Sequence, residues 1–189
     1  MNATARAALL ARREGRMPPP CDDKVLTNWN GLMLAVLAEA ARAFPAEGYL
    51  EPAGRLAEFL TTELRPGGKL MHVWRNGRTA VPAFLDDHAS LGLGLLALYQ
   101  TDGAPRWLEI ALELGETILK KFIGPQGTSW TDVDAEESSL LLAPRALQDS
   151  PIPGGGALAA QLFTLLHAFT GTPRFADQAA RMCSEMQDM

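Results

Sequence analysis

The chain has 189 residues, a length that suits one domain better than two small ones. Its hydrophobic content of 47% and charged content of 21% are ordinary for a globular protein with a real core. The net charge of −5 comes without a basic tract, so we expect no nucleic-acid partner. No apolar run reaches the roughly 18–20 residues of a membrane span, and Leu9-Leu10 is too short for a signal-peptide core. Cys21 and Cys183 have no ligand-type spacing, which favours a cytoplasmic protein with two bystander thiols.

Helical periodicity recurs along most of the chain. A short leading helix is expected over residues 2–14, because the Pro18-Pro19-Pro20 block that follows cannot continue it. Six further helices are predicted over residues 28–44, 48–64, 84–99, 105–122, 157–170 and 173–186. Short turns join them in consecutive pairs, which predicts three helical hairpins.

Residues 65–83 break the helical rhythm and predict a small β-ribbon. Residues 69–75 alternate like a strand, and residues 78–81 can return beside them. Asn76-Gly77 between them is the strongest short signal for a two-residue hairpin turn. A second irregular connection covers residues 124–153, where residues 129–131 could form a further strand.

The second helices of the three pairs begin alike, which indicates an internal repeat. Each has an aromatic residue in its first turn (Tyr49, Trp107 and Phe175) and an alanine about one turn later. The aromatic residues are 58 positions (107 − 49) and 68 positions (175 − 107) apart. Periods of this length with two helices each predict stacked α-hairpins, which cover one another's apolar faces.

This repeat has a consequence for function, because the first helices of equivalent hairpins point the same way. Their N-termini gather at one end, whatever residues they carry. The clusters at these starts are Asp22, Asp23, Trp29 and Asn30, then Asp86, Asp87 and His88, and finally Asp149 with the 153–156 loop. Three clusters placed at one end indicate a ligand site there.

Asp86 and Asp87 are the candidate catalytic residues. One Asp at a helix start is explained by capping of backbone N–H groups, but two in a row followed by a histidine exceed what a cap requires. Paired carboxylates can act as acid and base or bind sugar hydroxyls. His88 is a candidate substrate-binding residue, with an ordinary core or surface histidine as the alternative. The three histidines of the chain suggest no metal-ligand set, so we expect neither a metal nor a cofactor.

The remaining candidates would position the ligand. Trp29 and Asn30 suit a carbohydrate platform, in which an aromatic face lies against a sugar ring and an amide bonds its hydroxyls, although Trp29 could also be plain core. Asp22 and Asp23 could contact the ligand or form a solvated loop with an internal ion pair to Lys24. Asp149 would line the far side of the site. The glycine run 154–156 is explained by a tight turn, with an anion-binding nest as the weaker alternative.

Three stretches resemble motifs of a known family. They are the run from Arg13 through Asp22-Asp23-Lys24-Val25-Leu26-Thr27-Asn28-Trp29-Asn30-Gly31, then Phe84-Leu85-Asp86-Asp87-His88-Ala89, and Asp149…Ile152-Pro153…Gly155. Over roughly residues 5–181 the chain resembles the YyaL/spermatogenesis-associated protein 20 family. The resemblance implies an (α/α) toroid similar to six-hairpin glycosidases and N-acylglucosamine 2-epimerases, of which this chain would hold only the later part. The thioredoxin-like domain of family members, with its CxxC motif, has no counterpart here.

Two departures from the family pattern bear on the site. Family members usually have Tyr where this chain has His88. They also usually read Pro-Ser-Gly-Asn-Ser where this chain reads Pro-Gly-Gly-Gly-Ala over residues 153–157. The resemblance therefore implies a site that has lost hydroxyl and amide groups at that corner.

We predict one domain over residues 1–189, an all-α fold that is a partial (α/α) toroid of about three helical hairpins with short β-ribbon insertions. Two functions are open. The first is a carbohydrate-active or sugar-binding protein, glycosidase- or epimerase-like, that uses acidic residues at inner-helix N-termini. The second is a non-catalytic interaction or redox-partner scaffold. In either case the apolar faces of a half ring need a homodimer or the missing part of the toroid to cover them.

Overall fold

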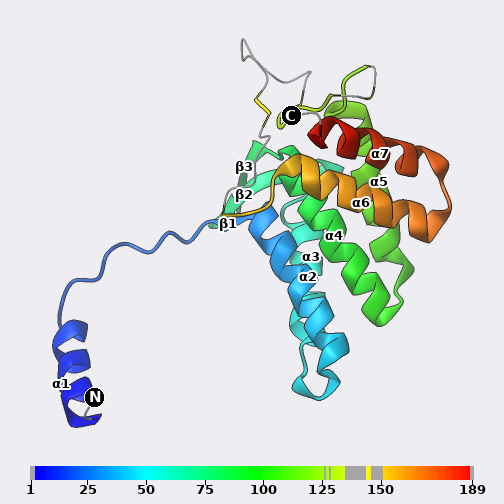
Figure 1. The fold of residues 1–189 in the computed structure, drawn as a ribbon. Helices are drawn as coiled ribbons and strands as arrows, with labels where there is room; N and C mark the ends of the chain where they lie inside the picture. Colours follow the sequence, from blue (N-terminus) through cyan, green and yellow to red (C-terminus); the bar gives the residue numbers. More distant parts are fainter. Residues whose placement is uncertain (1–2, 126, 128, 135–143, 146–150, 188–189) are drawn as a thin grey trace.

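The computed structural model describes residues 3–125, 127, 129–134, 144–145 and 151–187. Helix α1 (Ala3–Glu14) stands apart from the body at the end of an extended segment, and all its described residues are exposed (Figure 1). The helices of the body are α2 (Thr27–Ala43), α3 (Leu50–Thr62), α4 (Leu85–Asp102), α5 (Pro105–Lys121), α6 (Gly155–Thr170) and α7 (Pro173–Gln187). Two short 3₁₀ helices, η1 (Pro45–Glu47) and η2 (Pro66–Gly68), follow α2 and α3. All the predicted helices are therefore confirmed, with ends that differ by a few residues.

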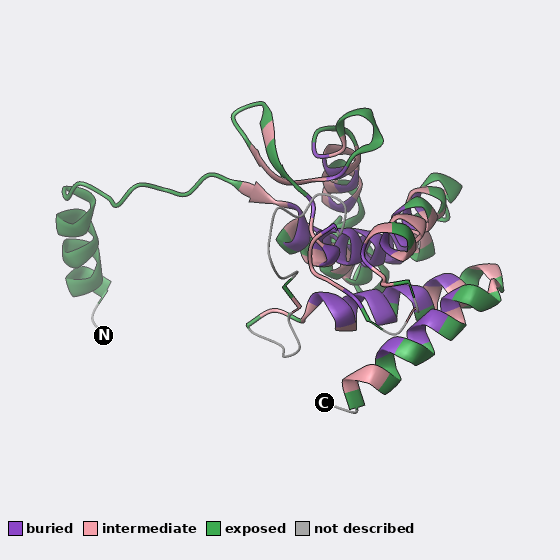
Figure 2. Ribbon diagram, turned by 90° about the horizontal axis from the view of Figure 1, so that it is seen from above, coloured by how far each residue is buried: buried purple, intermediate pink, exposed green. Residues whose placement is uncertain are grey.

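The body consists of three helical hairpins, α2–α3, α4–α5 and α6–α7, as predicted. Helices α2, α4 and α6 form an inner row in which α4 lies between the other two, and α4 also packs against α3 and α5. From Leu85 to Leu98 every residue of α4 except Asp86 is buried. Figure 2 shows this burial concentrated where the helices meet. A helix that is apolar on all sides needs neighbours on all sides, and α4 has them.

Two glycines allow α2 and α4 to approach closely. A Cβ atom added at Gly31 would lie 2.6 Å from the backbone nitrogen of Leu91, and one added at Gly94 would lie 2.6 Å from the carbonyl oxygen of Gly31. Any larger residue at either position would separate the helices. Gly31 thus allows the first turns of α2 to lie directly against the backbone of α4 at Ser90 and Leu91.

The repeat at the starts of the outer helices is visible in their contacts. Arg106 of α5 lies over the ring of Trp107 and pairs with Glu58 of α3. Arg174 of α7 lies over the ring of Phe175 and pairs with Glu116 of α5. The two aromatic rings are each 1% exposed, whereas Tyr49, the equivalent residue of the first hairpin, is 37% exposed. Each outer helix is therefore linked to the one before it, and the first has no such neighbour among the described residues.

The β-ribbon is a three-stranded antiparallel sheet in the order β1 (Val25–Leu26), β2 (Met71–Arg75) and β3 (Arg78–Pro82). The predicted turn is confirmed, because Asn76 and Gly77 have φ angles of 50° and 76°, as a two-residue hairpin of this type requires. Strand β1 was not predicted, since two residues carry no readable alternation. The expectation for residues 129–131 reduces to one isolated bridge, from Trp130 to Ile123.

The start of α2 has no side-chain cap, although Thr27 and Asn28 at its first two positions are residue types that often cap helices. Leu26 occupies the N-cap position, with no hydrogen bond from a capping side chain. The Thr27 hydroxyl instead donates to the carbonyl oxygen of Met71 at 2.6 Å, which ties the start of α2 to β2. Among the described helices, none combines the length and the apolar character that a membrane crossing requires.

Candidate functional site

The starts of the three inner helices lie together, as the repeat predicts. The backbone N–H of Asn28 donates to Asp87 Oδ1 at 2.9 Å, and its side-chain Nδ2 donates to Asp86 Oδ2 at 2.7 Å. These bonds join the first turns of α2 and α4. On the other side of Asp86, a Cβ added at Gly155, the first residue of α6, would lie 3.2 Å from the Asp86 nitrogen. Asp86 is thus bonded to α2 and lies close to the start of α6.

Asp87 is fully buried and its carboxylate is surrounded by donors. Besides the N–H of Asn28, it accepts the N–H of Phe84 at 2.9 Å and lies 2.8 Å from Nδ1 of His72 on β2. Burial raises the pKa of the Asp87 carboxyl, while the hydrogen bond from His72 opposes that rise. The hydrogen bond to Asp87 raises the pKa of His72 in turn. Asp87 therefore caps α4 and ties three elements together, and it presents no surface to a ligand.

Asp86 is the carboxylate of the pair that remains accessible. It is partly exposed, and its oxygens accept the N–H of Asp87 at 3.0 Å and Nδ2 of Asn28 at 2.7 Å. A carboxylate has about four lone-pair sites, so these two bonds orient the group and leave capacity for a ligand. Asp86 is thus the accessible carboxylate of the pair and Asp87 is the buried one.

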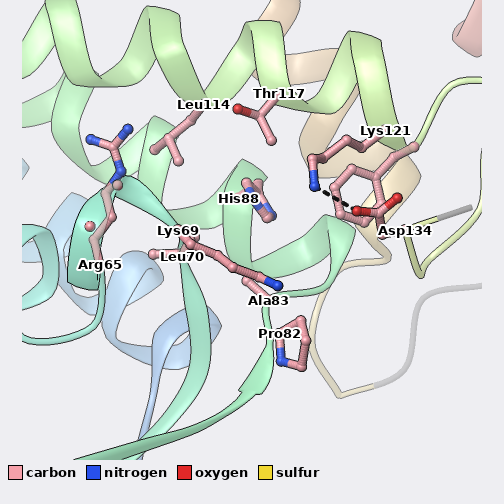
Figure 3. Close-up of a pocket in the computed structure, with 13 residues that line it drawn as sticks. Arg65, Lys69, Leu70, Pro82, Ala83, His88, Leu114, Thr117, Lys121 and Asp134 are labelled. Carbon is pink, nitrogen blue, oxygen red and sulfur yellow. Dashed lines mark hydrogen bonds and ion pairs between the residues drawn. The ribbon is translucent and has the colours of Figure 1, made fainter. Parts of the chain in front are cut away.

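His88 lies on a different side of α4, because consecutive residues of a helix point about 100° apart. Its Nδ1 is 2.8 Å from the carbonyl oxygen of Phe84, which can only accept, so Nδ1 carries the proton and Nε2 is an acceptor. The side chain lines a cavity of about 340 Å³ between the α3–β2 connection, β3 and α5 (Figure 3). We call this cavity the His88 pocket; its polar lining residues are Arg65, Lys69, His88, Thr117, Lys121 and Asp134. The structure thus separates His88 from Asp86 and Asp87.

The pKa of His88 is lowered to about 4, chiefly by burial, with the charges of Lys121 and Arg65 acting in the same direction. The imidazole is therefore neutral at pH 7. Its ring packs against Phe122, with the ring centres 5.1 Å apart.

The first sequence cluster does not converge on Asp86 as a group. Asp22 and Asp23 are exposed and form ion pairs with Lys24 and Arg75, and the bond to Lys24 lowers the pKa of Asp22. This is the solvated arrangement weighed above as the alternative. The Asn30 side chain donates to the carbonyl oxygen of Leu26 at 2.8 Å, inside its own helix start.

Trp29 is 59% exposed, so the plain-core interpretation of this residue is wrong. It begins a line of accessible apolar residues along α2, at spacings of three and four, which we call the α2 stripe: Trp29, Met33, Val36 and Ala40. Asp149 lies outside the described residues. Its predicted place on the far side of the site stays a prediction.

Sequence reasoning missed two residues of this site, His72 and Asn28 as a side-chain donor. His72 reaches Asp87 only because β2 pairs with β1, which leads directly into α2. A contact between segments so far apart in the sequence cannot be predicted from a local pattern. Within the described part of the chain, no group of three or more His, Cys, Asp or Glu side chains could hold a metal ion.

Comparison with known proteins agrees with the sequence motifs. Human spermatogenesis-associated protein 20 is 30% identical over 181 residues, which covers 90% of this chain and 23% of the human protein. The mouse protein is 30% identical over 186 residues, 93% of this chain and 24% of its own length. The chain is a distant homologue of spermatogenesis-associated protein 20. It spans about a quarter of the length of these relatives. No protein-family model matches the chain.

Solved structures show the fold. Cellobiose 2-epimerase from Spirochaeta thermophila superposes with a TM-score of 0.69 at 17% identity, over 84% of this chain and 42% of the enzyme. An α-mannanase of Bacteroides thetaiotaomicron gives 0.69 at 15% identity, over 88% and 46% of the two chains. An inactive α-1,6-mannanase of Salegentibacter, with two consecutive aspartates changed to asparagine and α-1,6-mannotriose bound, gives 0.61 at 16% identity, over 96% and 52%. The predicted fold, part of an (α/α) toroid, is confirmed, and this homologue of spermatogenesis-associated protein 20 corresponds to about half of such a ring.

Proposed function

We propose that the end of the bundle where α2, α4 and α6 begin is a carbohydrate-binding site centred on Asp86. One observation carries the proposal. The Asp86 carboxylate is partly exposed and is held by Asn28 and by the N–H of Asp87, beside Gly155 at the start of α6. An oriented carboxylate with unused lone pairs is suited to accept hydroxyl groups of a sugar.

The likeness to sugar-modifying enzymes supports this proposal. The epimerase and both mannanases share the fold, and one mannanase is inactive when two consecutive aspartates are changed. Asp86 and Asp87 are likewise consecutive. In a glycosidase- or epimerase-like reaction Asp86 would contact the substrate and act as acid or base. Asp87, with His72 behind it, would hold Asp86 and the start of α2 in place.

The test is sugar binding by the purified chain and its Asp86→Asn variant. Asparagine keeps the shape of the side chain but replaces one acceptor oxygen by a donor. We expect at least one mono- or disaccharide in a panel of glucose, mannose, cellobiose and mannobiose to raise the melting temperature. Isothermal titration should show a dissociation constant about tenfold higher for the variant, since a hydrogen bond to a charged group contributes about 1.5–3 kcal/mol.

Asp22→Asn is the matched control, because Asp22 belongs to the sequence cluster but is exposed and pairs with Lys24. It should bind sugars as the unmodified chain does. Equal binding by the unmodified chain and Asp86→Asn, or no binding of any sugar by a chain that melts cooperatively, would contradict the proposal. Turnover of the bound sugar, assayed next, would separate an enzyme from a binding protein.

The α2 stripe favours a second candidate, an interaction scaffold. Trp29, Met33 and Val36 are 59%, 52% and 59% exposed, and Phe44 just beyond α2 is 60% exposed. Apolar surface that is exposed in one chain in this way is typical of a site where another protein chain binds. Because the chain corresponds to 42–46% of an epimerase or mannanase ring, a second copy would supply about the missing half. We therefore expect the stripe to bind a second copy of this chain.

Light scattering on a concentration series tests the scaffold. The unmodified chain should dimerise, and Met33→Lys should remain a monomer that still melts cooperatively, with a melting temperature that no longer depends on concentration. Leu10→Lys, which places the same charge at a 45% exposed leucine of α1, is the matched control and should still dimerise. A monomer at every concentration, or equal dimerisation of Met33→Lys, would leave the stripe without this role.

A further inference from the structure

We propose that the α2 stripe of each chain binds α6 of a second copy, so that two chains close one ring. This inference rests on the dimer of the scaffold candidate above and deepens it, because it names the surface that the second copy offers. In a two-fold dimer, a contact between α2 of one copy and α6 of the other occurs twice, once at each edge. The chain corresponds to 42% of the epimerase chain and 46% of the mannanase chain, so two copies supply about one ring.

The inner row of helices has one open side at each end. Helix α4 lies between α2 and α6 and contacts both (Figure 1). Gly31 of α2 lies against the backbone of α4, and Leu162 of α6 lies against Gly92 of α4. A helix turns about 100° for each residue, so Met33 and Thr164, each two residues later, lie on the sides of α2 and α6 that are turned away from α4. Both side chains are exposed.

The composition of α6 favours a protein partner on its open side. From Gly155 to Thr170 the helix contains no Asp, Glu, Lys or Arg. Helix α4 has none of these residues between Asp87 and Asp102, and it is enclosed by other helices. The outer helix α7, by contrast, exposes charged side chains, namely Arg174, Asp177 and Arg181. Because a helix side that faces water usually carries charges, the uncharged open side of α6 resembles a side that is covered.

The two open sides also differ in size in a way that suits close packing. The α2 stripe carries large residues, whereas the exposed residues on the open side of α6 are smaller, namely Gln161, Thr164 and Ala168. Small residues facing large ones let two helices approach closely. The contact between α4 and α6 has this form, because a Cβ added at Gly92 would lie 2.8 Å from the Leu162 side chain.

The outer row of helices gives independent support. Trp107 and Phe175, at the starts of α5 and α7, are each 1% exposed and lie beside the preceding outer helix. Tyr49 at the start of α3 is 37% exposed. In the closed ring, α7 of the second copy takes the place of the preceding outer helix and covers Tyr49. The starts of all inner helices then lie at one end of the ring, together with both copies of Asp86.

Cross-linking of the full chain tests this arrangement. The exposed Cys21 and Cys183 are first changed to serine, and a new cysteine is then introduced as Met33→Cys in one variant and as Thr164→Cys in another. We expect an equal mixture of the two variants to form covalent dimers with a short bismaleimide, and each variant alone to form none. In light scattering, Thr164→Lys should raise the dimer dissociation constant at least about tenfold, because it places an unpaired charge in the interface.

Glu109→Cys is the matched control, because Glu109 is exposed on α5 of the middle hairpin, away from both open sides. Mixed with Met33→Cys, it should give no covalent dimer. Cross-linking of Met33→Cys alone would show that two α2 stripes face each other, which overturns this arrangement but leaves the dimer. A dimer in light scattering without cross-links between Met33→Cys and Thr164→Cys would do the same. A monomer at every concentration would contradict the scaffold candidate as well.

Discussion

The first turn of α4 carries two buried polar side chains with different surroundings, Asp87 and His88. On one side Asp87 is buried beneath hydrogen bonds from Asn28, Phe84 and His72. On the other side His88 is also buried, but its side chain lines a cavity together with Arg65 and Lys121. Adjacent residues of one motif therefore have separate surroundings, since a helix turns about 100° for each residue.

This contrast separates a structural polar group from one that is available for chemistry. A carboxylate surrounded by protein donors stabilises the contacts among α2, β2 and α4. An imidazole that lines a cavity and uses one nitrogen in a bond to the backbone keeps a lone pair on the other nitrogen. Substitutions on the first side should lower stability at neutral pH, whereas substitution of His88 should change stability in acid.

The largest expected effect is that of Asp87→Ala. This substitution removes the acceptor of two backbone N–H groups and the partner of His72, all at a position with no exposure. Removing one partner from such a buried network costs about 3–5 kcal/mol. Urea unfolding should show a loss of this size. Asp22→Ala, at an exposed carboxylate, should leave stability nearly unchanged. An equally small loss for Asp87→Ala would show that the bonds of Asp87 are dispensable.

The next largest effect concerns acid and the opposite side of the turn. The pKa of His88 is lowered to about 4, so between pH 6.5 and 4 the unfolded chain binds a proton that the folded chain does not. Stability should therefore fall as the pH is lowered through this window, by about 3 kcal/mol from this group alone. His88→Phe keeps a ring against Phe122 and should flatten the curve of unfolding free energy against pH. The same slope in both proteins would mean that His88 is protonated in the folded state.

Gly31→Ala should cost about 2 kcal/mol, because the new methyl group would meet the backbone of α4 at 2.6 Å and separate the two helix starts. The loss should also loosen the bonds from Asn28 to Asp86 and Asp87. Gly54→Ala on α3 is the matched control. Its Cβ would have no atom within 4 Å, so alanine should stabilise the helix by about 0.5–1 kcal/mol. Equal effects of the two substitutions would mean that α2 and α4 can separate without loss.

Much of the fold was predictable from the sequence because its signals are local. Helical periodicity, the Pro-Arg-aromatic starts of α5 and α7, and the Asn76-Gly77 turn each depend on neighbouring residues. The gathering of inner-helix starts followed from the repeat and is confirmed for Asn28, Asp86 and Gly155.

The different surroundings of Asp86, Asp87 and His88 were not predictable, because they depend on contacts between distant segments. Which of Asp86 and Asp87 is buried is decided by Asn28, 59 residues before Asp87, and by a strand pairing that involves two residues of β1. The His88 pocket needs the α3–β2 connection and the end of α5 to meet beside α4. Neither arrangement can be predicted from the spacing of neighbouring residues.

His72→Phe should have the smallest effect on stability. Its dependence on pH should be opposite to that of His88→Phe, which makes it a further test of the difference between the two sides of α4. Phenylalanine keeps the contact with the Phe84 ring, whose centre is 4.9 Å away, but removes one hydrogen bond to the Asp87 carboxylate, which is worth about 1.5 kcal/mol. Because the pKa of His72 is raised by Asp87, its stabilising charge is fully present below pH 6.5 and is lost as the pH rises through the folded-state pKa.

The loss caused by His72→Phe should therefore be larger at pH 6 than at pH 9. His88 works in the opposite sense, since its folded form becomes less stable towards acid. Unfolding free energies of both variants, measured by urea titration at several pH values, should thus deviate from those of the unmodified chain with opposite slopes. If both deviations had the same slope, the two histidines would share one electrostatic environment, and the separation of the Asp87 network from the His88 pocket would be wrong.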